Sequence, residues 1–538
     1  MKKNQQAENN EVPMSSKAVP GGTHESKHKR ETWSTRKVFI LAAIGSAVGL
    51  GNIWRFPYVA YENGGGAFII PYLVALLFAG IPLLFLDYAV GHKFRGSAPL
   101  AYRRLHRRAE GLGWWQVAIC FVIAVYYAVI IAWAGMYMIF SFTEAWGDDP
   151  EGFFIGQFLQ VSENVNIGFD FVPGVLVPLV LVWALVLFVL AAGVQKGIGR
   201  ANIIFLPLLL VMFLVLVVQA LFLPGAADGL DALFTPNWAA LADTGVWAAA
   251  FGQIFFSLSV AFGIMVTYAS YLKRRTDLTG SGYVVAFSNS GFEILAGIGV
   301  FAAVGFMAYS AGAPVNEVAG SGGIGLAFIA FPTIISQAPL GALLGVLFFG
   351  SLVFAGLTSL ISIVEVIISA VQDKLGLRRV PATMAVGLPM ALVSILLFPT
   401  TTGLNLLDVT DAFVNNFGIM AAAFVAVLLL TYGFRALPML GGHVNETSSI
   451  KLGRGWRIMV GIVAPVVLGY ILINELIARI QEGYNEMPAW FVGVFGWGMA
   501  GALIVIAFLL SLIPWSSRSA ATHPVLDAAD TDPKEASR

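Results

Sequence analysis

The sequence predicts an all-α integral membrane protein with twelve transmembrane helices. Hydrophobic residues make up 58% of the 538-residue chain and charged residues only 12%, about half the charged share of an average soluble domain. Long apolar runs recur along the chain, and each can cross about 30 Å of hydrocarbon. A soluble protein of this length would instead divide into domains with charged surfaces.

The apolar segments lie between two polar tails. Residues 1–35 lack the apolar core of a signal peptide, so we expect a disordered cytoplasmic tail whose end contributes to gating. Residues 36–515 form the membrane domain, and residues 516–538 form a second polar, cytoplasmic tail. The expected segments are 37–60, 66–91, 114–145, 172–191, 199–223, 245–271, 283–310, 338–373, 381–398, 406–434, 457–479 and 489–514.

The orientation follows from the lysines and arginines in the connections. They gather between segments 2 and 3, 4 and 5, 6 and 7, 8 and 9, and 10 and 11, whereas the alternate connections 3–4, 5–6, 7–8 and 9–10 have none. We therefore expect both termini in the cytoplasm of a multi-pass protein of the cell's inner (plasma) membrane, as an even number of segments requires.

Two segments are interrupted. Segment 1 breaks at "AVGLGN", and segment 6 has a Ser/Gly-rich middle between Ser257 and Gly263. They lie five segments apart, at matching places of two five-helix halves. Paired discontinuous helices indicate a binding site near the bilayer midplane between inverted repeats. Small residues at a helix contact would explain segment 6 alone, but not its pairing with segment 1.

The sequence gives no sign of nucleic-acid binding, of a disulfide framework or of nucleotide hydrolysis. The net charge is zero, so no basic field suggests a nucleic acid partner. The single cysteine, Cys120, lies in an apolar run and behaves as a small hydrophobe. No P-loop is present. Energy for uphill work must therefore come from another source.

Five motifs in order resemble the neurotransmitter:sodium symporter family, in its prokaryotic amino-acid branch. They are "GSAVGLGNIWRFPYVAYENGGGAFIIPY", "FFSLSVAFG", "SNSGFEILAG", "FAGLTSLISIVE" and "LDVTDAF". The resemblance extends from Arg30 to Trp515. It implies a five-plus-five inverted repeat with broken helices 1 and 6, followed by two C-terminal helices.

The resemblance implies two sodium sites built from neutral oxygens. A Ser or Thr could instead bond the carbonyl four residues earlier in its own helix. The first site, shared with the substrate carboxylate, uses Ala47, Asn52, Ser257 and Asn289. The second uses Gly45, Val48, Ala355, Thr358 and Ser359.

The resemblance also implies an amino-acid site at the two breaks, where half-helix N-termini suit a carboxylate. Amine carriers of the family place an Asp where this chain has Gly49, which favours an amino acid. The apolar positions Ile123, Phe256, Phe262 and Ile363 favour a hydrophobic or aromatic one, although simple core packing explains each of them singly. The other expected contacts are Ala47, Gly51, Tyr127, Ser259 and Ser359.

The same resemblance implies gates on both sides of the site. Arg55 and Asp411 form the extracellular gate, bridged by water when open. The intracellular gate consists of Arg30, Trp33, Tyr271 and Asp373. Arg30 could also be one more basic residue of a cytoplasmic tail.

Glu293 occupies the position at which animal members have a Ser beside a chloride ion. Its carboxylate, near Tyr72, Gln253, Ser257 and Asn289, would make chloride unnecessary. Gly197 and Pro207 mark an expected hinge in segment 5. Asp87 stands where the family usually has Glu and is left outside the site, and Glu365 is expected to be structural.

We therefore expect a sodium-coupled symporter, not an enzyme, that imports a neutral, hydrophobic or aromatic L-amino acid by alternating access. Its partners are the amino acid, about two Na⁺ ions and the lipid bilayer, without a chloride requirement; the resemblance allows a homodimer. One alternative is a symporter for a small or ω-amino acid such as glycine or a GABA-like compound. Two others are a non-transporting amino-acid receptor and an ion channel. The tails contain no recognisable signalling domain, and the two breaks indicate a closed pocket rather than the continuous polar pore of a channel.

Overall fold

A computed structural model describes residues 31–162, 164–318 and 323–516. The described residues are helical and form no β-strand beyond two isolated bridges. Arg30, assigned to the intracellular gate, lies outside the described residues. The principal helices are α1 (Arg36–Ala47), α2 (Leu50–Glu62), α3 (Ile69–Ala75), α4 (Ile81–Phe94), α5 (Ala98–Leu105), α6 (Glu110–Phe140), α7 (Pro173–Ala191), α8 (Arg200–Leu221), α9 (Ala226–Phe234), α10 (Thr244–Ser257), α11 (Ile264–Ala269), α12 (Leu278–Ala311), α14 (Phe331–Gln337), α15 (Gly341–Leu375), α16 (Arg379–Leu397), α17 (Gly403–Phe413), α18 (Met420–Leu428), α19 (Leu437–Thr447), α20 (Arg454–Ile458), α21 (Ala464–Gln481) and α23 (Met499–Leu512).

In the described part of the chain, ten helical stretches are long and apolar enough to cross a membrane. The third, seventh and eighth predicted segments correspond to Arg107–Phe140, Leu278–Ala311 and Gly341–Leu375. Their ends differ from the sequence prediction by a few residues because capping and loop packing, rather than hydropathy, set where a helix stops. The structure therefore confirms a helical protein with many apolar spans.

Segment 1 is divided into two helices. α1 and α2 meet at an angle of 54° around Val48 and Gly49, and together they count as one broken span. The Val48 amide still donates to the Ile44 carbonyl, whereas Gly49 has an extended backbone that begins α2. The carbonyls of the last turn of α1 and the amides of the first turn of α2 are thereby left without their usual helical partners.

Segment 6 is divided in a similar way. α10 has 14 residues and α11 has 6, and residues 258–263 between them are not helical. Neither helix reaches the length of a membrane span, which is why the segment is absent from the ten. The predicted total of twelve spans requires α10 and α11 to act as one.

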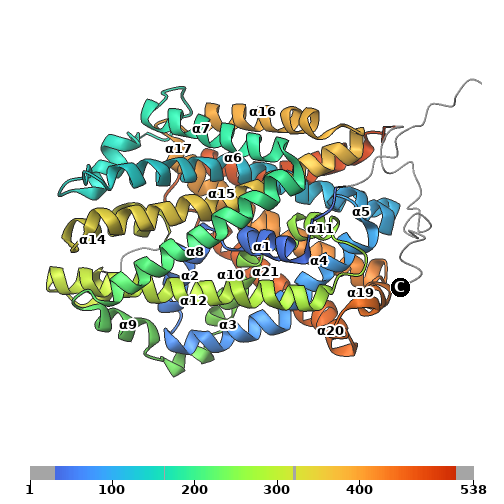
Figure 1. Cartoon of the computed structure of the whole chain (residues 1–538), viewed down its shortest axis with the longest axis horizontal. Helices are drawn as coiled ribbons and strands as arrows, with labels where there is room; N and C mark the ends of the chain where they lie inside the picture. Colours follow the sequence, from blue (N-terminus) through green and yellow to red (C-terminus); the bar gives the residue numbers. More distant parts are fainter. Residues whose placement is uncertain (1–30, 163, 319–322, 517–538) are drawn as a thin grey trace, which may run out of the picture. The chain divides into compact units, whose positions relative to one another are not determined.

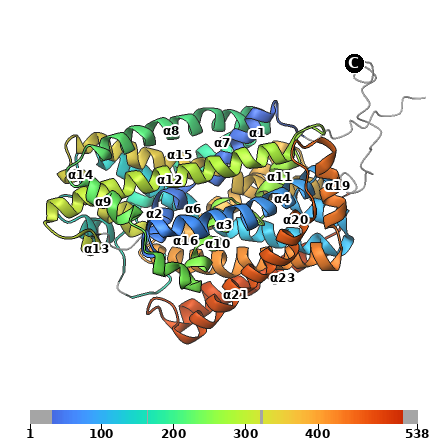
Figure 2. The ribbon, with the colours of Figure 1, turned by 90° about the horizontal axis from the view of Figure 1, so that it is seen from below.

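α6 and α15 pack against each other in the middle of the helical unit. In the most apolar part of α15 89% of the residues are buried, and in that of Arg107–Phe140, which contains α6, 83% are. In the last span, Ala489–Leu512, the buried share is only 22%. Figure 1 shows α15 beside α6 and α8, and Figure 2 shows α21 and α23 along the edge opposite α8. The two breaks therefore lie against helices that are themselves almost wholly covered by protein, as non-helical backbone at membrane depth requires.

Candidate functional site

Three buried polar side chains connect the two breaks to α12. Asn52 Nδ2 donates to Asn289 Oδ1 at 2.9 Å, and Asn289 Nδ2 donates to Ser257 Oγ at 3.1 Å. Asn52 Oδ1 also accepts from the Gly49 amide at 2.9 Å. The structure thus brings together Asn52, Ser257 and Asn289, which the sequence assigned to the first sodium site, at the end of α1 that carries Ala47.

The second expected sodium site lies where α1 meets α15. Ser359 Oγ lies 3.3 Å from the Ser46 carbonyl oxygen and 3.5 Å from that of Val48. Thr358 Oγ1 donates to the Ala355 carbonyl at 3.0 Å, and a Cβ on Gly45 would lie 3.3 Å from Thr358 Cβ. All five expected residues therefore meet at one helix contact, with uncharged oxygens.

Tyr127 meets the first turn of α2 beside Gly49. Its hydroxyl accepts a hydrogen bond from the Leu50 amide at 3.2 Å. A Cβ on Gly49 would lie 3.1 Å from this hydroxyl and 3.0 Å from Ser359 Oγ. We call this place the carboxylate corner: Tyr127 offers a phenol, Ser359 a hydroxyl, and the chain at Gly49 its backbone amides. These donors suit a carboxylate. Any side chain at position 49 would crowd it.

The break in segment 6 has an unusual backbone. Ser259 and Ala261 have φ values of 53° and 65°, and Gly263 has 90°. Positive φ is uncommon for residues other than glycine and concentrates at functional sites. Ser259 Oγ donates to the Ser46 carbonyl at 3.2 Å, so the two breaks touch each other directly.

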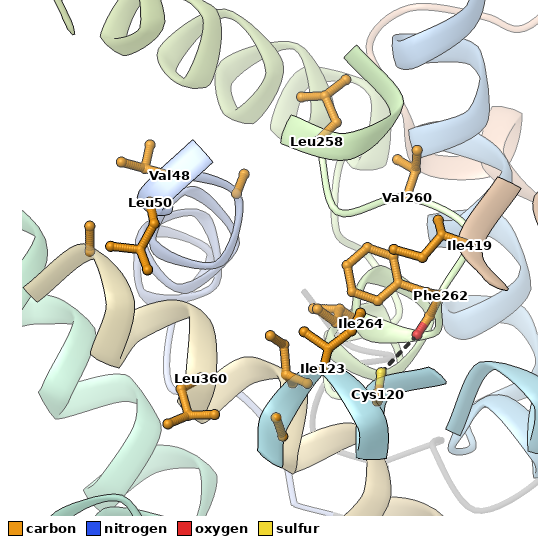
Figure 3. Packing of buried hydrophobic residues seen from close by; sticks show 14 of the residues in the cluster. Val48, Leu50, Cys120, Ile123, Leu258, Val260, Phe262, Ile264, Leu360 and Ile419 are labelled. Atoms are coloured by element: carbon orange, nitrogen blue, oxygen red, sulfur yellow. Dashed lines mark hydrogen bonds between the residues drawn. The ribbon is translucent and has the colours of Figure 1, made fainter. Parts of the chain in front are cut away.

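Three side chains from other helices hold this backbone, and sequence reasoning missed this role for all of them. Asp87 Oδ2 accepts from the Ala261 amide at 2.8 Å, and Gln116 Nε2 donates to the Ala261 carbonyl at 2.8 Å. Cys120 Sγ donates to the Phe262 carbonyl at 3.2 Å (Figure 3). The only available signal was a buried polar residue in each helix, and Cys120 looked like a plain hydrophobe.

The expected apolar lining is almost fully buried. Ile123, Phe262 and Ile363 are buried on α6, in the break and on α15. A Cβ on Gly51 would lie 2.5 Å from Phe256 Cε1, so the Phe256 ring covers the first turn of α2. Figure 3 shows Val48 and Leu50 at the facing ends of the segment 1 helices, and Phe262 in the other break.

The two residues of the expected outer gate are arranged separately. The Arg55 guanidinium lies over the Phe256 ring, 4.7 Å from its centre. Asp411 Oδ1 accepts from the Tyr126 hydroxyl at 2.6 Å and from Asn415 Nδ2 at 2.8 Å. Among the described residues no direct ion pair joins Arg55 to Asp411. Arg55, Phe256 and Asn415 also line a common pocket.

On the opposite side, Trp33 fastens the chain before α1 to the end of α11. Its backbone amide donates to the Tyr271 carbonyl at 3.0 Å, and its indole donates to the Tyr268 carbonyl at 2.9 Å. Asp373 accepts from the Ser97 amide at 2.7 Å. Trp33, Tyr271 and Asp373 are thus all engaged at the same end of the protein.

Glu365 has a partner that the sequence did not identify. Arg379 Nη1 and Nη2 lie 2.8 Å and 2.6 Å from the two Glu365 oxygens. The Tyr271 hydroxyl donates to the same carboxylate at 2.6 Å. A bidentate pair of this kind compensates for a fully buried carboxylate. Glu365, which is expected to be structural, is thus paired with Arg379 of α16 and bonded to Tyr271 of the expected intracellular gate.

Glu293 lies wholly buried on α12. Tyr72 donates its hydroxyl hydrogen to one carboxylate oxygen, and Gln253 Nε2 donates to the other at 2.7 Å. The structure therefore brings together Glu293, Tyr72 and Gln253, as the sequence predicts.

The expected hinge in segment 5 begins with a π-helical turn over Val194–Gly199. Pro207 lies inside α8, which continues through it. A Cβ on Gly197 would lie 1.9 Å from the Val189 carbonyl oxygen, so only glycine allows this approach. The π-helical turn weakens the hydrogen-bond ladder at the start of α8, and Pro207 removes one further donor later in the helix.

Comparison with protein families decides the class. The model of the sodium:neurotransmitter symporter family matches residues 30–150 and 147–518. The chain belongs to the sodium:neurotransmitter symporter family. The motif-based resemblance is confirmed, and with it a multi-pass membrane protein of a sodium-dependent transporter family.

Individual relatives agree with this assignment to the symporter family. An uncharacterized sodium-dependent transporter of Methanocaldococcus jannaschii is 43% identical over 90% of this chain and 97% of its own length. The mouse sodium- and chloride-dependent neutral and basic amino acid transporter B(0+) is 30% identical over 94% of this chain and 87% of its own. The crystal structure of MhsT in complex with L-phenylalanine matches with a TM-score of 0.69 and 31% identity, covering 83% of this chain and 99% of that one.

Proposed function

We propose that this symporter imports a neutral, hydrophobic or aromatic L-amino acid together with about two sodium ions, independently of chloride. Twelve spans, with segments 1 and 6 broken and both termini in the cytoplasm of the plasma membrane, provide the frame. Helices α6 and α15 and their neighbours hold one wall of the site, and the broken segments move against that wall.

The carboxylate corner carries the proposal. Tyr127, the Leu50 amide and Ser359 gather around Gly49, and this position has no space for a carboxylate of the protein's own. The substrate must therefore bring the carboxylate, as an amino acid does. The same carboxylate lies close to the Asn52 and Ser257 set, so bound sodium and bound substrate favour each other.

The proposed preference for a hydrophobic side chain rests on Ile123, Phe256, Phe262 and Ile363. These residues offer no polar partner to a substrate side chain. An isolated polar group placed among them would lose its hydrogen bonds to water without replacement. MhsT, bound to L-phenylalanine in its crystal structure, supports the same reading.

Independence of chloride rests on Glu293. Its carboxylate, with Tyr72 and Gln253 as donors, already supplies a negative charge next to Asn289 and Ser257. An additional anion there would meet like charge in a medium of low dielectric constant. The buried Glu293 therefore replaces the anion that a chloride-dependent carrier would need.

A competition panel tests the proposed substrate class. Sodium-dependent binding of radiolabelled leucine to the purified protein is challenged with each amino acid, with GABA and with serotonin. We expect large apolar and aromatic L-amino acids to compete best, and serotonin not to compete. Stronger competition by glycine or GABA would favour the small-substrate alternative, and competition by serotonin alone would contradict the carboxylate corner.

A further inference from the structure

Asn202 in α8 has a buried side-chain amide whose nitrogen is hydrogen-bonded and whose oxygen is not, within the part of the chain that the structure describes. Its side chain is fully buried, and Nδ2 donates to the Ile198 carbonyl at 2.9 Å. Oδ1 has no hydrogen-bond partner among the described residues. Native proteins pair the great majority of buried side-chain oxygens, so such an atom calls for a ligand.

The unpaired oxygen is directed at the α1–α15 contact. A Cβ on Gly45 would lie 2.2 Å from Asn202 Oδ1 and 3.3 Å from Thr358 Cβ. Only the missing side chain of Gly45 allows the amide oxygen to come this close. α8 packs against both α1 and α15. Asn202 Oδ1 therefore reaches Gly45 of the proposed second sodium site from a third helix, on the side of Gly45 that also faces Thr358.

The other side-chain oxygens at this contact already have partners. Thr358 Oγ1 donates to the Phe354 and Ala355 carbonyls, and Ser359 Oγ approaches the Ser46 carbonyl. A hydroxyl can donate to a carbonyl and still direct a lone pair at a cation. An amide oxygen only accepts, so a cation or a donor must complete it. Amide carbonyls are among the oxygens that hard cations prefer.

We propose that Asn202 Oδ1 is an additional ligand of the sodium ion held by Gly45, Val48, Ala355, Thr358 and Ser359, contributed from α8. This inference rests on the proposed function, because it assumes a sodium ion at that contact. An amide ligand adds an oxygen without adding charge, so the ion remains the only charge at the site and can still leave it.

The same side chain connects the ion to the hinge. Asn202 Nδ2 is anchored to Ile198, inside the π-helical turn Val194–Gly199. The Val194 amide at the start of this turn donates to Glu31 Oε2 at 2.6 Å, which ties the turn to the chain before α1. A rearrangement of the turn displaces the anchor and with it Oδ1. Opening of the inner end of α8 therefore removes a sodium ligand and promotes release of the ion to the cytoplasm.

A simpler role for Asn202 is packing on Gly45, with a weak contact from the Gly45 Cα–H group to the amide oxygen. The two roles predict different effects of an Asn202 substitution on sodium binding. A packing residue affects folding with or without sodium, whereas a ligand affects the concentration of sodium that the protein needs.

The test measures binding of radioactive sodium to the purified full-length protein, together with the rise in unfolding temperature that sodium causes. Asn202→Leu keeps the volume and removes the oxygen, Asn202→Ala removes it without added bulk, and Asn202→Asp keeps it. Because Leu and Ala each remove one oxygen ligand of the ion, we expect each to raise the half-saturating sodium concentration about tenfold. Asp should bind as tightly as the native residue or more tightly. Values within about twofold of the native protein for both Leu and Ala would overturn the inference.

Two controls separate this inference from the function on which it rests. Ser394→Ala removes a buried hydroxyl that donates to the Val125 carbonyl at 2.6 Å, between α16 and α6 rather than at the α1–α15 contact, and should leave sodium affinity unchanged. Thr358→Val and Ser359→Ala should weaken sodium binding strongly. If they do so and Asn202→Leu does not, only the role of Asn202 is wrong. If none of the three changes sodium binding, the proposed second sodium site is wrong as well.

Discussion

The carboxylate of Asp87 in α4 accepts a hydrogen bond from the backbone amide of Ala261, 174 residues later in the chain. Ala261 lies in the break of segment 6 with a positive φ. The bond fixes an uncommon backbone conformation from outside its own helix. It also means that the break is held by protein side chains before any substrate contributes.

We predict that Asp87→Leu destabilises the protein and weakens substrate binding. The Ala261 amide would lose its acceptor, and a buried unpaired donor costs about 1–3 kcal/mol. Asp87→Asn keeps a carbonyl acceptor and should retain most of the binding. Thermal unfolding and sodium-dependent leucine binding measure both effects. Equal behaviour of the Leu and Asn variants would contradict this role of Asp87.

Gly49→Ala should abolish most amino-acid binding. The added Cβ would lie 3.0 Å from Ser359 Oγ and 3.1 Å from the Tyr127 hydroxyl, in the corner that we propose for the substrate carboxylate. We expect at least a tenfold loss of affinity, equivalent to about 1.4 kcal/mol. Gly135→Ala, in α6, is the matched control because its added Cβ meets no atom within 4 Å. Unchanged affinity in Gly49→Ala would place the carboxylate elsewhere.

Replacing Glu293 by Ser should create a chloride requirement. The substitution removes the buried carboxyl group and leaves Tyr72 and Gln253 with donors that suit an anion. Uptake by Glu293→Ser should be low in gluconate buffer and recover at least about fivefold in chloride, because one anion replaces another at the same donors. The native protein should transport equally in both buffers. A chloride requirement of the native protein would refute the proposed role of Glu293.

Arg379→Met should lower the unfolding temperature far more than the double variant Glu365→Met/Arg379→Met. Loss of one member of a buried ion pair leaves an uncompensated charge and typically costs about 3–5 kcal/mol, whereas replacement of both by apolar side chains is close to neutral. Arg379 holds both Glu365 oxygens. Similar unfolding temperatures for the single and double variants would show that the pair contributes little.

Stability should decrease between about pH 6.5 and pH 4 because of His443, which follows the tenth predicted span in α19. Burial, with Lys93 and Arg274 nearby, lowers the pKa of His443 to about 4. An unfolded histidine titrates near pH 6.5, so below this pH the unfolded chain binds a proton that the folded chain does not. The contribution is therefore constant above pH 6.5 and lost as the pH falls.

The variant His443→Gln isolates the effect of His443. In the native protein His92 Nδ1 and His443 Nε2 lie 2.9 Å apart, and a glutamine at position 443 can still bond His92. Unfolding temperatures of the native protein and the variant are measured across this pH range. The native curve should fall more steeply than that of His443→Gln. Parallel curves would mean that groups other than His443 dominate the titration.

The sequence alone was sufficient for the membrane class, the family, the two breaks and the polar residues that gather at them. These follow from local signals: hydropathy, glycine and serine within apolar runs, and short motifs. Asn52, Ser257 and Asn289 were predicted as one set, and the structure brings them together.

The residues that support the breaks could not be predicted in the same way. Gln116 and Cys120 reach the Ala261 and Phe262 carbonyls across more than 140 residues of chain. Arg379 meets Glu365 only because α15 and α16 fold back on each other. Such contacts depend on how helices are oriented against one another, and a single polar residue in an apolar run does not reveal its partner.

The central claim is sodium-coupled amino-acid import, and uptake into proteoliposomes tests it most directly. Purified protein is reconstituted, and accumulation of radiolabelled leucine is followed with and without an inward sodium gradient, at constant chloride. We predict accumulation above the external concentration only with the gradient, and its loss in Ser359→Ala. Equilibration of leucine that ignores the gradient, or no uptake despite sodium-dependent binding, would contradict the account.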